Sequence, residues 1–129
     1  MRALLGGLAC LVLVSCGPEE QAKPTAASGQ ALFRTYCAIC HAAAAPGGPE
    51  SKVVRAGPNL FGVYGRPAGA LDFAYSKALK NSGLVWDEAR LDLFLANPQK
   101  LAPGTLMGFN GEPDPQKRRA IIDYLKSLN

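Results

Sequence analysis

Cys37-Ala38-Ile39-Cys40-His41 is the most informative motif of this 129-residue chain. A Cys-x-x-Cys-His pattern is typical of covalent attachment of a c-type haem. On a helix-like turn, two cysteines three positions apart can reach the two vinyl groups along one porphyrin edge. The histidine that follows can then turn its imidazole under the iron. The motif therefore predicts a chain folded around one haem, attached through Cys37 and Cys40 and ligated by His41.

Three other sites could use the same cysteines. A zinc site needs about four Cys or His ligands, and after the first 15 residues the chain offers only Cys16 outside the motif. A thioredoxin-like dithiol normally follows a strand of a βαβ unit, and no strand pattern is visible. A disulfide between Cys37 and Cys40 would close a very small loop and stabilise the fold little. Haem attachment is the interpretation that also uses His41.

The second axial ligand can be argued by elimination. His41 is the only histidine, and Met107 is the only methionine apart from Met1, so two histidines of one chain cannot both ligate the iron. A lone methionine usually fills a gap in a core. Met107, however, ends the turn PGTLM (residues 103–107), which can hold a thioether between two helices. We therefore expect Met107 to be the sixth ligand, which raises the reduction potential and fills both axial positions.

The N-terminus has the pattern of an export signal. Met1 and Arg2 give a positive end, and an apolar run over residues 3–14 follows. A helix of about 12 residues rises about 18 Å, whereas a bilayer core needs roughly 20 residues, so the run favours a signal over an uncleaved anchor. Residues 13–16, Leu-Val-Ser-Cys, resemble the bacterial lipobox. This resemblance implies that residues 1–15 are removed and that Cys16 carries a diacylglyceryl thioether.

Residues 16–27 would then form a lipidated N-terminus and a flexible tether, rich in Pro, Ala and charge. The tether spans at most about 36 Å, and it leads into one domain over residues 28–129. These features predict a protein held by its lipid at the periplasmic face of a bacterial membrane. Cleavage by an ordinary signal peptidase would instead leave a soluble periplasmic domain.

Apolar spacing and capping residues predict an all-α domain with about four to five short helices. No segment alternates as a strand does, and the Gly- and Pro-rich stretches between helices predict long loops wrapped around the cofactor. We expect a first helix that is capped by Ser28 and ends at Tyr36, and a second over 75–81 that is capped by Ser76. A third should run from Asp87 to Asn97-Pro98 and bury Leu91, Phe94 and Leu95. The last should begin at Asp114-Pro115, with Ile121, Leu125 and Leu128 on its apolar face.

Several further motifs occur in a familiar order: GPNLFGVYGRPAG at 57–69, Trp86, Asn97-Pro98, PGTLM at 103–107 and YLKSL at 124–128. From about Gly29 to Leu128 the chain resembles a class I cytochrome c, close to the mitochondrial and alpha-proteobacterial branch. The resemblance implies the class I cytochrome c fold around one haem c. It also implies an electron carrier that works by outer-sphere transfer, and not an enzyme.

The resemblance assigns roles to matching positions. The Pro58 carbonyl would accept the second imidazole N–H of His41. Arg66, Tyr75 and Trp86 would surround the haem propionates. Thr105 and Asn97 would support the methionine loop, and the first and last helices would cross at Gly29, Phe33, Tyr124 and Leu125. The chain departs from the family at Phe94, where a tyrosine is common, and at Leu79, near a usual asparagine.

The charge of the chain is mildly basic. The formal net charge is +4, and loss of Arg2 with the signal leaves +3, which is no nucleic-acid signature. Lys52, Arg55 and Lys100 could steer acidic partners. Leu106 and the stretch 112–114 stand where mitochondrial relatives carry lysines, so we expect docking that is weaker and less sensitive to salt.

The implied partners are membrane redox complexes: a cytochrome bc1-type donor, and a terminal oxidase or photosynthetic reaction centre as acceptor. We expect the protein to be a monomer. Haem catalysis or gas sensing is the main alternative, and it requires an open iron position and usually a distal acid or base. A third possibility is the haem subunit of a periplasmic dehydrogenase.

Overall fold

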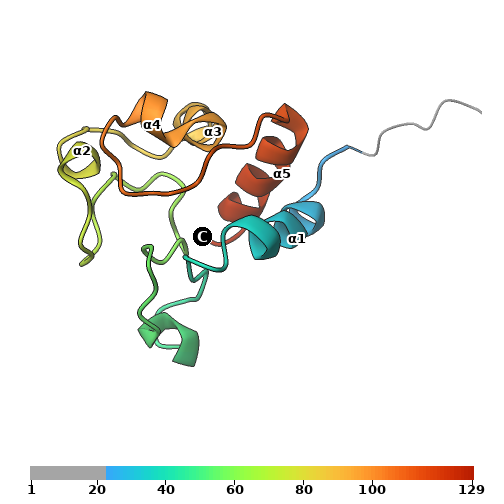
Figure 1. Cartoon of the computed structure of the whole chain (residues 1–129). Helices are drawn as coiled ribbons and strands as arrows, with labels where there is room; N and C mark the ends of the chain where they lie inside the picture. The colour runs from blue at the N-terminus through green and yellow to red at the C-terminus, as the bar shows by residue number, and fades with distance from the viewer. Residues whose placement is uncertain (1–22) are drawn as a thin grey trace, which may run out of the picture.

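The computed structural model describes residues 23–129. Within them the only strand-like pairing is an isolated antiparallel bridge between Pro67 and Val85, so the predicted all-α fold with long loops is confirmed. Figure 1 shows α1 and α5 side by side, with α3, α4 and α2 to the left of them. The elements are α1 (Ala26–Tyr36), the 3-10 helix η1 (Pro49–Lys52), α2 (Lys77–Lys80), α3 (Glu88–Ala96), α4 (Pro98–Leu101) and α5 (Pro115–Lys126).

Helix α1 begins earlier than the sequence predicts. Its N-cap is Thr25, whose hydroxyl accepts a hydrogen bond from the backbone N–H of Ser28 at 3.2 Å. In return the Ser28 hydroxyl accepts one from the Thr25 backbone N–H at 3.0 Å. This reciprocal pair is a capping box, which satisfies two N–H groups at once. Ser28 is therefore the third residue of the helix and not its cap, and residues 26–27, expected in the tether, are helical.

The other predicted helix starts are observed. The side chains of Ser76, Asp87 and Asp114 cap α2, α3 and α5 by accepting backbone hydrogen bonds at 3.2, 2.8 and 2.8 Å. Each cap satisfies an N–H group that the first turn leaves unpaired. Asn97 ends α3 as predicted, and its side chain then caps α4 by accepting from the Lys100 N–H at 2.9 Å. Helix α4 was not predicted, because Asn-Pro marks a helix start as well as a helix end.

The crossing of α1 and α5 joins the two ends of the domain. The rings of Phe33 and Tyr124 lie 5.3 Å apart between centroids, and Leu125 is buried beside them. Gly29 marks the closest approach: a Cβ there would lie 2.6 Å from the carbonyl carbon of Ala120 and 2.9 Å from the Cβ of Tyr124. Only glycine allows the two backbones to come this close.

The expected signal peptide over 1–15, the lipidation site Cys16 and most of the tether lie outside the described residues. Among residues 23–129, no helix is both long enough and apolar enough to cross a membrane.

Candidate functional site

Residues 37–41 form a helix-like turn at the end of α1. The Cys37 N–H donates to the Phe33 carbonyl at 2.8 Å, and the N–H groups of Cys40 and His41 donate to the Cys37 carbonyl at 3.0 and 2.9 Å. Cys37 is half-buried and Cys40 is exposed. Burial, with a smaller effect from Cys40, raises the pKa of Cys37 to about 11. The turn thus presents two thiols and an imidazole from five consecutive residues.

His41 is held in one tautomer. Its Nδ1 lies 2.8 Å from the carbonyl oxygen of Pro58. A carbonyl can only accept, so Nδ1 carries the proton and Nε2 keeps a free lone pair. Burial lowers the pKa of His41, although the Pro58 bond acts in the opposite direction, and the ring is therefore neutral near pH 7. A neutral imidazole with a free Nε2 is a form that ligates metal ions.

Gly57 provides the space for this ring. A Cβ on Gly57 would lie 2.6 Å from His41 Nδ1, and the Gly57 N–H donates to the Cys40 carbonyl at 2.7 Å. The backbone of the next loop therefore lies directly against the imidazole. This role of Gly57 could not be predicted from the sequence, because the contact joins segments that are separated by the loop containing η1.

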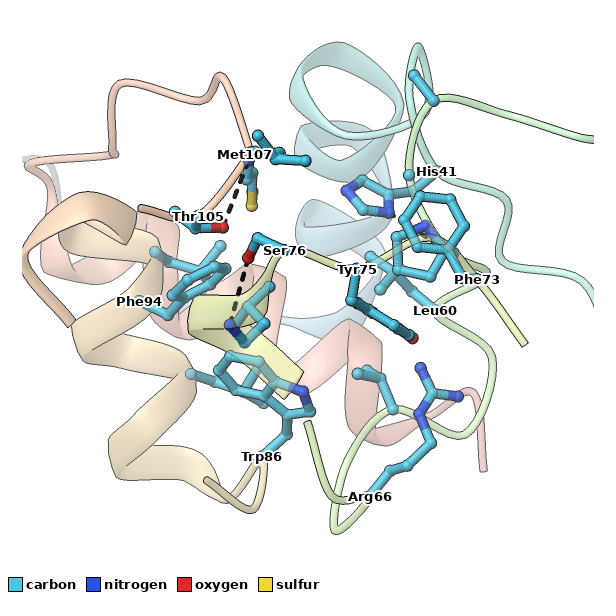
Figure 2. Close-up of a pocket in the computed structure, with 18 of the residues that line it drawn as sticks. His41, Leu60, Arg66, Phe73, Tyr75, Ser76, Trp86, Phe94, Thr105 and Met107 are labelled. Atoms are coloured by element: carbon cyan, nitrogen blue, oxygen red, sulfur yellow. Dashed lines mark hydrogen bonds between the residues drawn. The ribbon is translucent and has the colours of Figure 1, made fainter. Parts of the chain in front are cut away.

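A mostly apolar pocket lies between His41 and Met107. Figure 2 shows the two side chains on different sides of the pocket, with the Met107 sulfur facing inward. Thr105 is buried, and its hydroxyl accepts a hydrogen bond from the Met107 N–H at 3.4 Å. The apolar part of the lining includes Leu60, Val63, Leu91, Leu95 and Leu125. The fold thus brings together the two residues that the sequence selected as iron ligands.

Polar side chains gather at the other end of the pocket. Arg66, Tyr75 and Trp86 line it together, as the lower part of Figure 2 shows. The Arg66 guanidinium donates to the carbonyls of Phe61 and Asn59, each at 3.0 Å. Burial lowers the pKa of Arg66 and raises the pKa of Tyr75, but an arginine remains charged in any case. A fixed cation beside a phenol and an indole suits a ligand with carboxylate groups.

The two departures from the family also line the pocket. Phe94 is buried and packs on Trp86, with ring centroids 4.9 Å apart. Leu79 lies in the lining beside the N-terminus of α2. Both side chains are hydrocarbon, so this part of the pocket is apolar.

The three basic side chains considered for docking differ in whether they are exposed or engaged in contacts. Lys52 and Lys100 are exposed. Arg55 is engaged: it donates to the Ala38 carbonyl at 3.1 Å and pairs with Glu50 at 3.3 Å. It therefore fastens the loop after His41 to the cysteine turn, a role that the sequence analysis did not predict.

The Cytochrome c family model matches residues 26–129. The chain belongs to the cytochrome c family. Cytochrome c of Theileria annulata is 47% identical over 103 residues, which cover 80% of this chain and 85% of that protein. Cytochrome c2 of Rhodopila globiformis is 45% identical over 101 residues, which cover 78% and 90%. The structure of cytochrome cH from Methylobacterium extorquens matches with a TM-score of 0.70 and 43% identity, covering 80% of this chain and 98% of that one.

As a class I cytochrome c, the chain is a mono-haem electron carrier and not an enzyme. It takes one covalent haem c with histidine and methionine ligation. The residues present fit this group: two thiols on one turn, an imidazole with a free Nε2, and a thioether at the far side of an apolar pocket.

Proposed function

We propose that Cys37 and Cys40 hold the haem by thioether bonds and that His41 Nε2 and Met107 Sδ are its axial ligands. Each thioether forms when the S–H of a cysteine adds across a vinyl group, so the step needs no oxidant. The observation that carries the assignment is the pocket itself, with a neutral, oriented imidazole on one side and a thioether on another. The bound haem supplies one-electron cycling between ferrous and ferric iron.

The surrounding residues then orient these ligands. The Pro58 carbonyl fixes the tautomer of His41 and raises the basicity of Nε2. Thr105 holds the backbone of Met107. Arg66, Tyr75 and Trp86 would surround the propionates, where the fixed charge of Arg66 offsets the cost of burying a carboxylate.

Ligation by both His41 and Met107 leaves no axial position for a substrate or a gas. Outer-sphere electron transfer follows from this arrangement, since no bond to iron has to form or break. Catalysis or gas sensing would need an open position and a distal acid or base, and the single histidine of the chain is already used.

The optical spectrum of the purified haem protein tests the assignment. The ferric form should show the weak near-infrared band of methionine sulfur on haem iron, and carbon monoxide should leave the ferrous spectrum unchanged. Absence of the band together with ready binding of carbon monoxide would overturn it and favour the catalytic or sensing role.

We also propose that the protein is held at the periplasmic face of a bacterial membrane by a lipid on Cys16, with residues 1–15 removed, residues 16–24 as the lipidated N-terminus and tether, and the haem domain beginning at the N-cap of α1, Thr25. The Ser-Cys pair after an apolar run supports this. A lipid would keep the domain close to membrane redox complexes, here a cytochrome bc1-type donor and a terminal oxidase or photosynthetic reaction centre as acceptor.

Cell fractionation of a Cys16→Ser variant tests the anchor. We expect the parent protein in the membrane fraction and the variant in the periplasmic fraction, because the variant has no thiol to lipidate. Cys10→Ser, inside the apolar run, is the matched control and should remain with the membranes. Equal membrane retention of Cys16→Ser would rule the anchor out.

The surface near the cysteine turn presents aliphatic side chains, which favours docking to a redox partner with little dependence on salt concentration. Ile39 and Val54 are 82% and 95% exposed. The bond from Arg55 to the Ala38 carbonyl ties the segments of these two side chains together, and the pairing of Arg55 with Glu50 neutralises its charge. We infer that a partner here meets aliphatic side chains rather than a ring of cations.

A further inference from the structure

We propose that Gln99 is a positioning residue that keeps the methionine loop, residues 103–107, closed over the haem pocket. The proposal rests on the ligation by Met107 proposed above. The side-chain amide of Gln99 bonds to the loop twice: Nε2 donates to the Thr105 carbonyl at 2.8 Å, and Oε1 accepts from the Gly104 N–H at 3.2 Å. One side chain of α4 thus bonds to the backbone of two neighbouring residues shortly before the ligand.

Few other hydrogen bonds hold this loop. The Thr105 N–H donates to the Ala102 carbonyl at 2.9 Å, and the Met107 N–H donates to the Thr105 hydroxyl at 3.4 Å. Within the described part of the chain, the backbone of residues 106–111 makes no further hydrogen bond. Three hydrogen bonds therefore attach the loop to the rest of the domain, all at residues 104 and 105, and Gln99 makes two of them.

Gln99 stands on a rigid base. Helix α4 begins with Pro98, which is fully buried, and is followed by Ala102, which is 3% exposed. The Asn97 side chain caps the helix. Gln99 itself is exposed, so its two bonds fasten the loop without filling the core. Removal of the amide should then loosen the loop and leave the rest of the domain in place.

The chemistry of the bridge restricts the residue type. It needs a donor and an acceptor at the end of a side chain of this length, which glutamine has and glutamate has only in part, because a carboxylate cannot donate. An incoming ligand reaches the iron only after the Met107 sulfur has moved away. Loop opening therefore sets the rate at which an external ligand replaces methionine.

Imidazole binding to the ferric holoprotein measures this opening. We expect Gln99→Met, of similar volume and without either bond, to bind imidazole about tenfold faster than the parent, as expected for the loss of two partly exposed hydrogen bonds. Gln99→Glu keeps the acceptor for Gly104 and should show a smaller increase, about threefold. Gln30→Met, on the exposed surface of α1, is the matched control and should bind at the parental rate.

A second control separates the loop from general stability. Thr25→Ala removes the N-cap of α1, a helix that does not pack against α4, and it should weaken the fold and leave the imidazole rate unchanged. If the parent shows the methionine band and Gln99→Met binds imidazole at the parental rate, or if Thr25→Ala accelerates binding as much as Gln99→Met, the positioning role is wrong. If the parent itself lacks the band, the ligation by Met107 fails instead.

Discussion

Replacing Met107 with alanine is expected to let the ferrous protein bind carbon monoxide, which the parent protein should exclude. The side chain lines the pocket from the side away from His41, and alanine cannot reach the iron. The near-infrared band of the ferric form should disappear. The reduction potential should fall by a sizeable part of the roughly 0.8 V that axial ligands control, because methionine ligation raises it. Optical titration and voltammetry measure these changes.

Leu106→Ala is the matched control for this variant. Leu106 is the preceding residue of the same loop, and its side chain is 79% exposed, so its truncation leaves the sulfur in place. The control should keep the band and exclude carbon monoxide. Should Met107→Ala keep the band, another group must supply the sixth ligand.

Gly29→Ala is expected to cause the largest loss of stability among single methyl additions in α1. The added Cβ would lie 2.6 Å from the carbonyl carbon of Ala120, and the obstacle is the backbone of α5, which cannot rotate away as a side chain can. The helices must separate, which weakens the packing of Phe33 on Tyr124. We expect the free energy of unfolding to fall by about 3 kcal/mol, which chemical denaturation of the holoprotein measures.

Gly48→Ala provides the comparison. Gly48 has φ −74°, which any residue adopts, and a Cβ there meets only the Ala45 carbonyl at 3.5 Å. The same methyl group should therefore change the free energy of unfolding by less than about 0.5 kcal/mol. Equal losses in the two variants would show that the crossing of α1 and α5 is not especially tight.

The features best predicted from the sequence are those that depend on residues close together in the chain. The cysteine turn and the caps Ser76, Asp87 and Asp114 are local signals, in which residue type and spacing decide the geometry. The start of α1 was misplaced for a similar reason: Thr25 and Ser28 can each cap a helix, and only the reciprocal bonds between them show which one does.

The family resemblance implied some contacts between distant segments, such as Pro58 with His41 and Phe33 with Tyr124, and these are observed. Other contacts between distant segments could not be predicted from one sequence. Nothing in the stretch around Arg55 indicates that its guanidinium reaches the Ala38 carbonyl. At Gly57 there is no room for a side chain, because the His41 ring from another segment occupies that space. The hydrogen bond of Gln99 to the methionine loop could not be predicted either: Asn97, two residues earlier, caps α4, and Gln99 reaches the Thr105 carbonyl.

The crossing of α1 and α5 also sets an order of events while the chain is being made. Synthesis delivers the N-terminal end first, so α1 and the thiols of Cys37 and Cys40 emerge long before α5. Until then α1 has no partner for Gly29 and Phe33, and an isolated helix of 11 residues is marginal in water. The thiols of the cysteine turn are therefore accessible before the crossing forms, and with the proposed attachment α5 would close the fold over a haem already bound.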